Sequence, residues 1–186
     1  REIIELSEIA SRDMLEEIML HRQLRAAENG DLAVDNQLVN SIDLLKSAVG
    51  RIEGHEVAHE KRIIVVDHSS DGNIETDRIL LHRVLINMLK NALEATEKGG
   101  TVYAGVQKFD DKVRFHIKND KVMPREIQLQ VFQRSFSTKG KGRGVGTYSI
   151  KLLSENYLNG KVGFISSESE GTVFFVDLFK LKKANN

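Results

Sequence analysis

The sequence predicts an α+β fold, a two-layer α/β sandwich in which helices cover one face of a mixed sheet, preceded by a long N-terminal helix. Three observations predict this class. The first 29 residues contain neither glycine nor proline, amphipathic segments then alternate with a short β-branched segment, and the second half holds hairpin-like pairs with a period of two. Helices followed by a mixed set of strands are typical of a sheet that buries one face.

The N-terminal segment 1–29 has the pattern of one amphipathic helix, about 40 Å long at about 1.5 Å per residue. Asn29, Gly30 and Asp31 supply its stop. A helix this long cannot bury its apolar stripe alone, so we expect a helical hairpin or a homodimer. We therefore divide the chain into a helix at 1–31 and a main domain at 32–186. The residues of the stripe are Ile3, Leu6, Ala10, Met14, Ile18 and Leu24.

Three elements are predicted before residue 100. The segment 39–52 has a helical apolar face, and RIIVVD at 62–67 is short and β-branched, as in a buried strand. Thr76 and Asp77 open a strongly periodic helix that ends at 99–100, where two glycines stand. Its predicted inward face comprises Ile79, Leu80, Val84, Leu85, Met88, Leu89, Ala92 and Leu93.

The remaining segments are predicted to form four strands, one helix and a long loop. Strands are expected at 101–109 and 112–119, and again at 161–168 and 172–180, with a helix at 145–157. Residues 120–144 are polar, basic and rich in glycine around one apolar group. A loop this long inside a compact domain is typically a functional lid.

Charge and composition exclude several function classes. The 27 basic residues balance the 27 acidic ones, so we expect no nucleic-acid partner. The chain has no cysteine, which excludes disulfides, thiolate metal sites and a cysteine nucleophile. No apolar run approaches the roughly 18 to 20 residues of a spanning helix. We expect a cytoplasmic domain, cut from a longer protein with a sensor domain or membrane anchor, because the chain starts inside a helical pattern.

A glycine cluster stands directly before the predicted helix at 145–157. Gly142, Gly144 and Gly146 leave backbone N–H groups uncovered, and the following helix directs its positive end the same way. The combination indicates an anion site, most naturally for phosphates, although a plain flexible loop tip has the same composition. The context fits neither a P-loop nor a dinucleotide fingerprint.

Two asparagines on the helix that begins at Asp77 form a second candidate. Asn87 and Asn91 are four residues apart, so both amides share one helical face. Buried amides cost free energy unless they find partners, and an asparagine oxygen can bind Mg²⁺ among waters and phosphate oxygens. The alternative is that one of the amides caps a neighbouring strand end or faces solvent.

In order and spacing, the chain resembles the ATP-binding domain of sensor histidine kinases. The motifs are NMLKNALEA, IKNDKVMP, VFQRSFSTKG, GRGVGTYS and EGTVFFVDL, and the resemblance covers about residues 60–180. The segment EIASRDMLEEIMLHRQLRAAENGDL resembles the second helix of the family's dimerisation hairpin. The resemblance implies the Bergerat fold, which gyrase-type, Hsp90-type and MutL-type ATPases share.

The resemblance also implies roles for individual residues. Asn91 would coordinate Mg²⁺ on the ATP phosphates, with Asn87 lining the same site, and Asn119 would accept from the adenine amino group. Lys139 would meet phosphate at the end of the lid motif that contains Phe132 and Phe136. Residues of the glycine box would hold the phosphates: Gly142, Arg143, Gly144, Val145, Gly146 and Thr147. Gly171 and Thr172 match the last motif, which a tight turn explains equally well.

Two departures from the family pattern carry information. Asn119 stands where the family has aspartate, and no glycine follows it through Pro124, so adenine binding is expected to be weaker or differently shaped. Lys121 contacts the nucleotide or is a solvated loop lysine. Arg83, beside His82, stands where the superfamily's ATPases carry the glutamate that activates water. Its identity argues for phosphoryl transfer over hydrolysis.

The position of the phosphoacceptor histidine is unknown, and we expect it upstream of this chain. His21 falls where the second hairpin helix is expected, and His68 and His116 have structural patterns. The pairs His55-Glu56 and His59-Glu60 are surface groups or an incidental metal-binding pair. The expected activity is Mg·ATP-dependent transfer to a histidine on the hairpin, then to a response regulator receiver domain. The alternatives are an anti-sigma type serine kinase and a non-catalytic nucleotide-binding scaffold.

Overall fold

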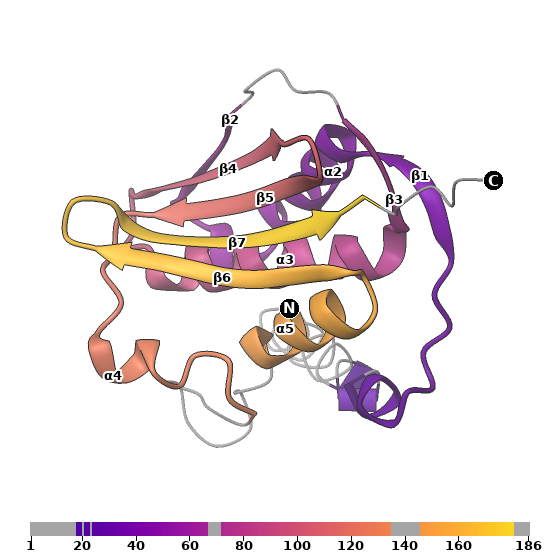
Figure 1. Cartoon of the computed structure of the whole chain (residues 1–186). Coiled ribbons are helices and arrows are strands. Elements are labelled where there is room, and N and C mark those ends of the chain that lie inside the picture. Colours follow the sequence, from indigo (N-terminus) through magenta and orange to yellow (C-terminus); the bar gives the residue numbers. More distant parts are fainter. Residues whose placement is uncertain (1–17, 20, 23, 67–71, 135–145, 181–186) are drawn as a thin grey trace, which may run out of the picture. The chain divides into compact units, whose positions relative to one another are not determined.

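The computed structural model describes residues 18–19, 21–22, 24–66, 72–134 and 146–180. The chain divides into two compact units, Arg1–Ala33 and Val34–Asn186. The larger unit holds every strand of the described chain and the helices labelled in Figure 1.

The described residues of the smaller unit are helical up to position 29. Gly30 then adopts a φ of 80°, and the N–H of Asp31 donates to the carbonyl of Ala26 over 2.8 Å. This left-handed glycine with its backward hydrogen bond is an ordinary helix C-terminus, so the predicted stop is confirmed. Residues 1–17 of the predicted helix lie outside the described residues.

The larger unit is built on a mixed five-stranded sheet in the order β2-β4-β5-β7-β6 (Figure 1). Strands β2 and β4 are parallel, and the other neighbours are antiparallel. The predicted strands are confirmed with small shifts at their ends. Their bounds are β2 Arg62–Val66, β4 Thr101–Lys108, β5 Lys112–Asn119, β6 Gly160–Ser167 and β7 Gly171–Phe179.

Three helices cover one face of this sheet: α2 (Ser41–Glu53), α3 (Arg78–Ala95) and α5 (Gly146–Asn156) (Figure 1). A short 3₁₀ turn, η1, at Glu56–Ala58 follows α2. Helix α3 lies in the middle of the layer and packs on both α2 and α5. The predicted two-layer class is therefore confirmed. The fully buried core includes Leu44, Leu45, Leu81, Leu85, Met88, Leu89, Leu93, Phe115, Ile117 and Ile150.

A second, two-stranded sheet was not predicted. Strand β1 (Asn36–Asn40) pairs antiparallel with β3 (Asn73–Asp77). Asn40 and Asp77 each end a strand and cap the next helix, since their side chains accept from the first helical N–H groups. Helix α2 therefore begins slightly later than the predicted start at about Val39, because the cap at Asn40 stops it from extending backward, whereas Asp77 opens α3 as predicted.

The inward face of α3 is confirmed except at its first apolar residue. Ile79 is 70% exposed, whereas Leu81, which was not predicted inward, is fully buried. At about 3.6 residues per turn, positions 81, 85, 88 and 92 follow one stripe, and position 79 points about 160° away from the direction of 81. Ile79 is apolar but off the stripe.

The predicted irregular stretch at 120–144 contains one short helix, α4, at Arg125–Gln128. Pro124 precedes it, and its carbonyl accepts from the N–H groups of Ile127 and Gln128. The assignment of the whole stretch as irregular is therefore wrong for these residues. The residues from 135 to 145 lie outside the described chain.

The sheet face opposite the helices carries a buried ion cluster around Asp177 on β7. Arg114, opposite it on β5, donates from Nε and Nη2 to the carboxylate over 2.6 and 2.8 Å, and Lys112 donates over 2.8 Å. The guanidinium also stacks 4.1 Å from the centre of the Phe175 ring. Burial raises the pKa of Asp177, but the hydrogen bonds from Arg114 and Lys112 outweigh it, and the net shift is downward.

The lowered pKa of Asp177 makes the stability of the fold depend on pH. Its carboxylate contributes stability above the pKa of the unfolded chain, about 4, and loses it as pH falls through the lower folded value. We expect Asp177→Asn to cost about 2 kcal/mol at pH 7 and much less near pH 3, measured by urea unfolding. Asp111→Asn, an exposed change of the same charge, is the control. Equal losses for the two variants would contradict the assignment.

Candidate functional site

Helix α3 places a row of polar side chains along one flank, outside its apolar stripe. Arg83, Asn87 and Asn91 follow one another at intervals of four, so they share a face, and all are half-buried. The Nδ2 atoms of Asn87 and Asn91 are buried and have no hydrogen-bond partner among the described residues. An unsatisfied buried amide costs about 1 to 3 kcal/mol, so two on adjacent turns require an explanation.

The N-terminus of α5 meets this row at Gly146, the first residue of the helix. A Cβ atom built on Gly146 would lie 3.5 Å from Asn91 Oδ1 and 3.8 Å from Nδ2. The end of the predicted glycine box and the second asparagine are therefore neighbours in space, although 55 positions separate them in the printed sequence. The arrangement sets an amide oxygen beside the N–H groups of a helix start, a suitable place for an anion and its counter-cation.

Asn119, the last residue of β5, lies on the helix-covered side of the sheet and is 4% exposed. Its Oδ1 accepts the N–H of Lys121 over 3.0 Å, which is an Asx turn. Its register partner on β7 is Thr172, and the register partner of Thr172 on β6 is Ser166. The three side chains thus form one row at the end of the sheet.

The hydroxyl groups of this row hold the loop that follows Asn119. Thr172 donates to the carbonyl of Lys121 over 2.6 Å, and Ser166 accepts from the N–H of Met123 over 2.8 Å. Since the proton of Thr172 is committed, Ser166 donates to Thr172 Oγ1 across their 2.8 Å contact. The sequence analysis missed Ser166. The only signal for it in the sequence is that hydroxyl residues, Ser166 and Thr172, flank the turn at Gly171.

The turn between β6 and β7 closes against the same loop. Gly171 has a φ of 70°, and a Cβ there would collide with the carbonyl oxygen of Asn119 and lie 2.7 Å from Asp120 Cα. Glycine is required because of both the backbone conformation and the contact. The predicted tight turn is confirmed, and Thr172 is tied to the strand end of Asn119.

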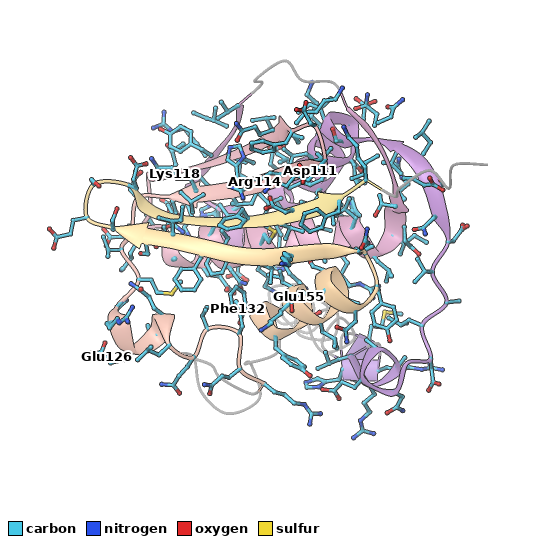
Figure 2. The ribbon with its side chains drawn as sticks, in the orientation of Figure 1. Asp111, Arg114, Lys118, Glu126, Phe132 and Glu155 are labelled. Atoms are coloured by element: carbon cyan, nitrogen blue, oxygen red, sulfur yellow. The ribbon has the colours of Figure 1, made fainter. Side chains whose placement is uncertain are left out.

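The side chains of Lys121 and Phe132 both contact other residues of the domain. The ammonium of Lys121 lies 3.8 Å from the carboxylate of Glu97, and both side chains are largely exposed. This placement agrees with the prediction of a solvated loop lysine. The ring of Phe132 lies 5.9 Å from that of Phe164 on β6 and 6.1 Å, edge-on, from that of Phe174 on β7. Figure 2 shows Phe132 below β6 beside α5. Phe132 therefore anchors the end of the described loop in an aromatic cluster.

Arg83 and His82 point to different surroundings. His82 Nε2 lies 3.4 Å from Ser47 Oγ on α2, on the flank away from the asparagines, and burial lowers the pKa of His82 although a hydrogen bond with the Ser47 backbone opposes it. Burial also lowers the pKa of Arg83, opposed by Asp77, although a guanidinium stays charged at any working pH. No carboxylate among the described residues forms a salt bridge with Arg83.

The described histidines have local roles or lie in solvent. His55 Nδ1 accepts the N–H of Val57 and caps the turn η1. His59 is exposed and lies 3.6 Å from Glu60, and His21 is exposed on the N-terminal helix. His116 faces Gly105, where a Cβ would lie 2.6 Å from the imidazole ring. Within the described ranges, histidine, aspartate and glutamate form no cluster of three that could hold a metal.

Several predicted site residues lie outside the described chain. They are His68, Phe136, Lys139, Gly142, Arg143, Gly144 and Val145. Thr147 is described and half-buried in the first turn of α5. Across the parts that can be searched, none of the helices has the length and apolarity needed to span a bilayer.

Two orphaned amides on one helix beside the N-terminus of another, over a mixed sheet, make a place suited to an anion and its cation, as in the phosphate sites of nucleotide-binding domains. The chain belongs to the family of histidine kinase-, DNA gyrase B- and HSP90-like ATPases, whose family model matches residues 76–183. Within it, the similar proteins are histidine kinases, so the domain is the ATP-binding domain of the sensor histidine kinase type. The resemblance stated from the sequence is confirmed.

Among curated proteins, the chain is 34% identical over 101 residues to sporulation kinase E of Bacillus subtilis, covering 53% of this chain and 13% of that protein. It is 34% identical over 107 residues to sporulation kinase C of the same organism, with 56% and 24% covered. The heme sensor protein HssS of Staphylococcus aureus is 27% identical over 124 residues, with 65% and 27% covered. The chain thus spans a quarter or less of the two sporulation kinases.

Solved structures agree on the fold. The catalytic domain of histidine kinase ThkA matches with a TM-score of 0.67 at 26% identity, over 78% of this chain and 96% of that one. Histidine kinase AdeS of Acinetobacter baumannii matches with a TM-score of 0.74 at 15% identity, over 96% and 85%. ThkA in complex with the response regulator protein TrrA matches with a TM-score of 0.71 at 19% identity, over 95% and 51%.

The tight contact at Gly171 predicts a large effect of one methyl group. We expect Gly171→Ala to lower the free energy of unfolding by about 2 to 5 kcal/mol, since the turn must move from Asn119 and leave its favoured φ. Gly54→Ala is the matched control, because Gly54 has a φ of −79° and no atom within 4 Å of an added Cβ. Urea unfolding measures both, and similar losses would refute the close approach.

Proposed function

We propose that this chain is the catalytic part of a sensor histidine kinase that binds Mg·ATP and transfers its γ-phosphoryl group to a histidine. One observation carries the proposal: the buried amides of Asn87 and Asn91 lack partners among the described residues, beside the start of α5. Without a ligand to bind them, these two unsatisfied buried amides would only lower the stability of the fold. A triphosphate with its cation supplies what the two amides lack.

The donor set suits magnesium on a nucleotide. Asn91 Oδ1 is a hard oxygen ligand, and a site with few protein ligands leaves positions for water and phosphate oxygens, which Mg²⁺ prefers. Bound there, Mg²⁺ would neutralise phosphate charge during transfer. Asn87 would orient the same phosphates, and the N–H groups of Gly146 and Thr147 would donate hydrogen bonds to their oxygens. Lys139 and the segment Gly142–Val145 would close the site from the lid.

Arg83 favours transfer over hydrolysis. A water-activating general base needs a carboxylate or imidazole within reach of the water. The position one turn before Asn87 holds a guanidinium, and His82 contacts Ser47 on α2 instead. Without a base to activate water, the γ-phosphoryl group is left for a nucleophile from another segment. A neutral imidazole supplied by a helix is such a nucleophile.

The remaining steps concern partners. We propose that the acceptor histidine lies on a dimerisation hairpin to which residues 1–31 contribute one helix, so that the protein acts as a homodimer. A response regulator receiver domain would take the phosphoryl group next, as the named partner of ThkA suggests. Attachment of the whole protein to a membrane or a sensor domain agrees with the sensor protein names among the relatives.

The first test is calorimetric titration with a non-hydrolysable ATP analogue, with and without Mg²⁺. We expect micromolar to sub-millimolar binding that requires Mg²⁺, and its loss in Asn91→Ala. The same variant should unfold no more easily than the wild type, because it removes an unsatisfied buried amide and alanine is the better helix former.

The control for this titration is Asn156→Ala, the same change at an exposed position of α5. It should bind the analogue as the wild type does. Unchanged binding in Asn91→Ala, or no binding by the wild type at millimolar nucleotide, would refute the proposal. A loss of stability in Asn91→Ala would assign the amide to the fold instead.

A second prediction concerns hydrolysis. We expect the wild type to release phosphate from ATP slowly and Arg83→Glu to raise the rate at saturating ATP by at least about tenfold, since it adds a general base. Arg83→Gln removes the cation without adding a base and should stay slow. Equal rates for the glutamate and glutamine variants would show that position 83 does not reach the attacking water.

A further inference from the structure

We infer that the amide of Asn119 makes the base site permissive at position 6 of the purine, so that 6-oxopurine nucleotides such as GTP and ITP bind together with ATP. The inference rests on the proposed function and on the contact with the base that the resemblance implies for Asn119. It concerns which edge of the amide the base meets.

The contact with Lys121 fixes the orientation of the Asn119 amide. The group that faces the side chain across 3.0 Å is a backbone N–H, which can only donate. If the amide were flipped, its NH₂ group would oppose this N–H, and two donors would meet inside a site that is 4% exposed. The oxygen therefore faces the turn, and the NH₂ group faces away from it.

The surrounding hydrogen bonds keep the turn from releasing that oxygen. Thr172 holds the carbonyl of Lys121, and Ser166 holds the N–H of Met123. Gln128 Nε2 donates to the carbonyl of Met123 over 2.8 Å, which ties the loop to α4. The N–H of Lys121 thus stays directed at Asn119. Among the described residues no hydrogen bond from Nδ2 is seen, and Nδ2 is not one of the fully buried unpartnered atoms, so its protons can reach solvent or a ligand.

A hydrogen-bond donor at this position binds a different set of bases than a carboxylate would bind. An aspartate at this position would present an anionic oxygen, which attracts the amino group of adenine and repels the carbonyl oxygen of a 6-oxopurine. The NH₂ group of Asn119 can donate to N1 of adenine or to O6 of guanine and hypoxanthine. The amide also lacks the charge that would exclude a carbonyl oxygen.

The test compares dissociation constants of the whole chain for the β,γ-imido analogues of ATP, GTP and ITP in Mg²⁺, by calorimetry. ITP differs from ATP at position 6 without the 2-amino group of GTP. We expect the ITP and GTP analogues to bind within about tenfold of the ATP analogue, the range of one neutral hydrogen bond. In Asn119→Asp, we expect both to weaken by about tenfold or more relative to ATP.

Aspartate keeps the Asx turn, since its carboxylate also accepts from the N–H of Lys121. Gln107→Glu, an exposed change of the same kind on β4, is the matched control and should leave all three constants unchanged. Thermal unfolding checks that both variants fold. If the aspartate variant does not, Asn119→Ser, which offers a hydroxyl that both donates and accepts, should keep the three analogues within about tenfold of one another.

The outcomes separate the two proposals. Binding of the ATP analogue with a preference over the ITP analogue of about a hundredfold or more would overturn the inference and leave the proposed function intact. The absence of binding for every nucleotide would overturn both. Equal weakening of all three analogues in Asn119→Asp would mean that the side chain supports the site without reading position 6.

Discussion

The packing of α3 is the constraint on which the rest of the domain depends. Its apolar stripe, fully buried at Leu81, Leu85 and Leu89, fixes the rotation of the helix against the sheet. With the rotation fixed, the flank that carries Asn87 and Asn91 faces the neighbouring helix α5, next to its first residue. The two amides lie beside the start of α5 because the apolar residues of the helix are buried in the core. Orphaned hydroxyls also occur at Ser41, Thr76 and Ser154, but on three different elements.

The sheet arranges a second group of polar side chains, at the ends of its strands. Pairing of β5 with β7 and of β7 with β6 aligns Asn119, Thr172 and Ser166 in one row. A row of small polar side chains at the strand ends can satisfy the backbone of the next loop, which an apolar row could not. The amides on α3 thus lack partners, whereas the polar groups at the strand ends are satisfied. Only the first kind needs a ligand to complete it.

Much of the fold could be predicted because its signals are long or local. The stripe of α3 repeats over 18 residues, and β4, β5, β6 and β7 show their two faces over at least eight residues each. Strands β1 and β3 were missed because five residues such as NQLVN and NIETD carry no clear alternation. The asparagine pair was predictable from its spacing. The contacts of Thr172 and Ser166 with the loop were not, since they join residues 43 and 51 positions apart.

The loop after Asn119 stands at the same place in the chain as the family's glycine motif but contains different residues. The family pattern has glycines here, and this chain has side-chain hydrogen bonds from β6 and β7 instead. A loop held in this way loses less conformational entropy when a ligand binds, which favours affinity even where one charged contact is missing. The same bonds hold the oxygen of Asn119 and leave its NH₂ group outward. Loss of the glycines and replacement of the aspartate are therefore consistent with each other, since the loop is held by side-chain hydrogen bonds that also fix the orientation of the Asn119 amide.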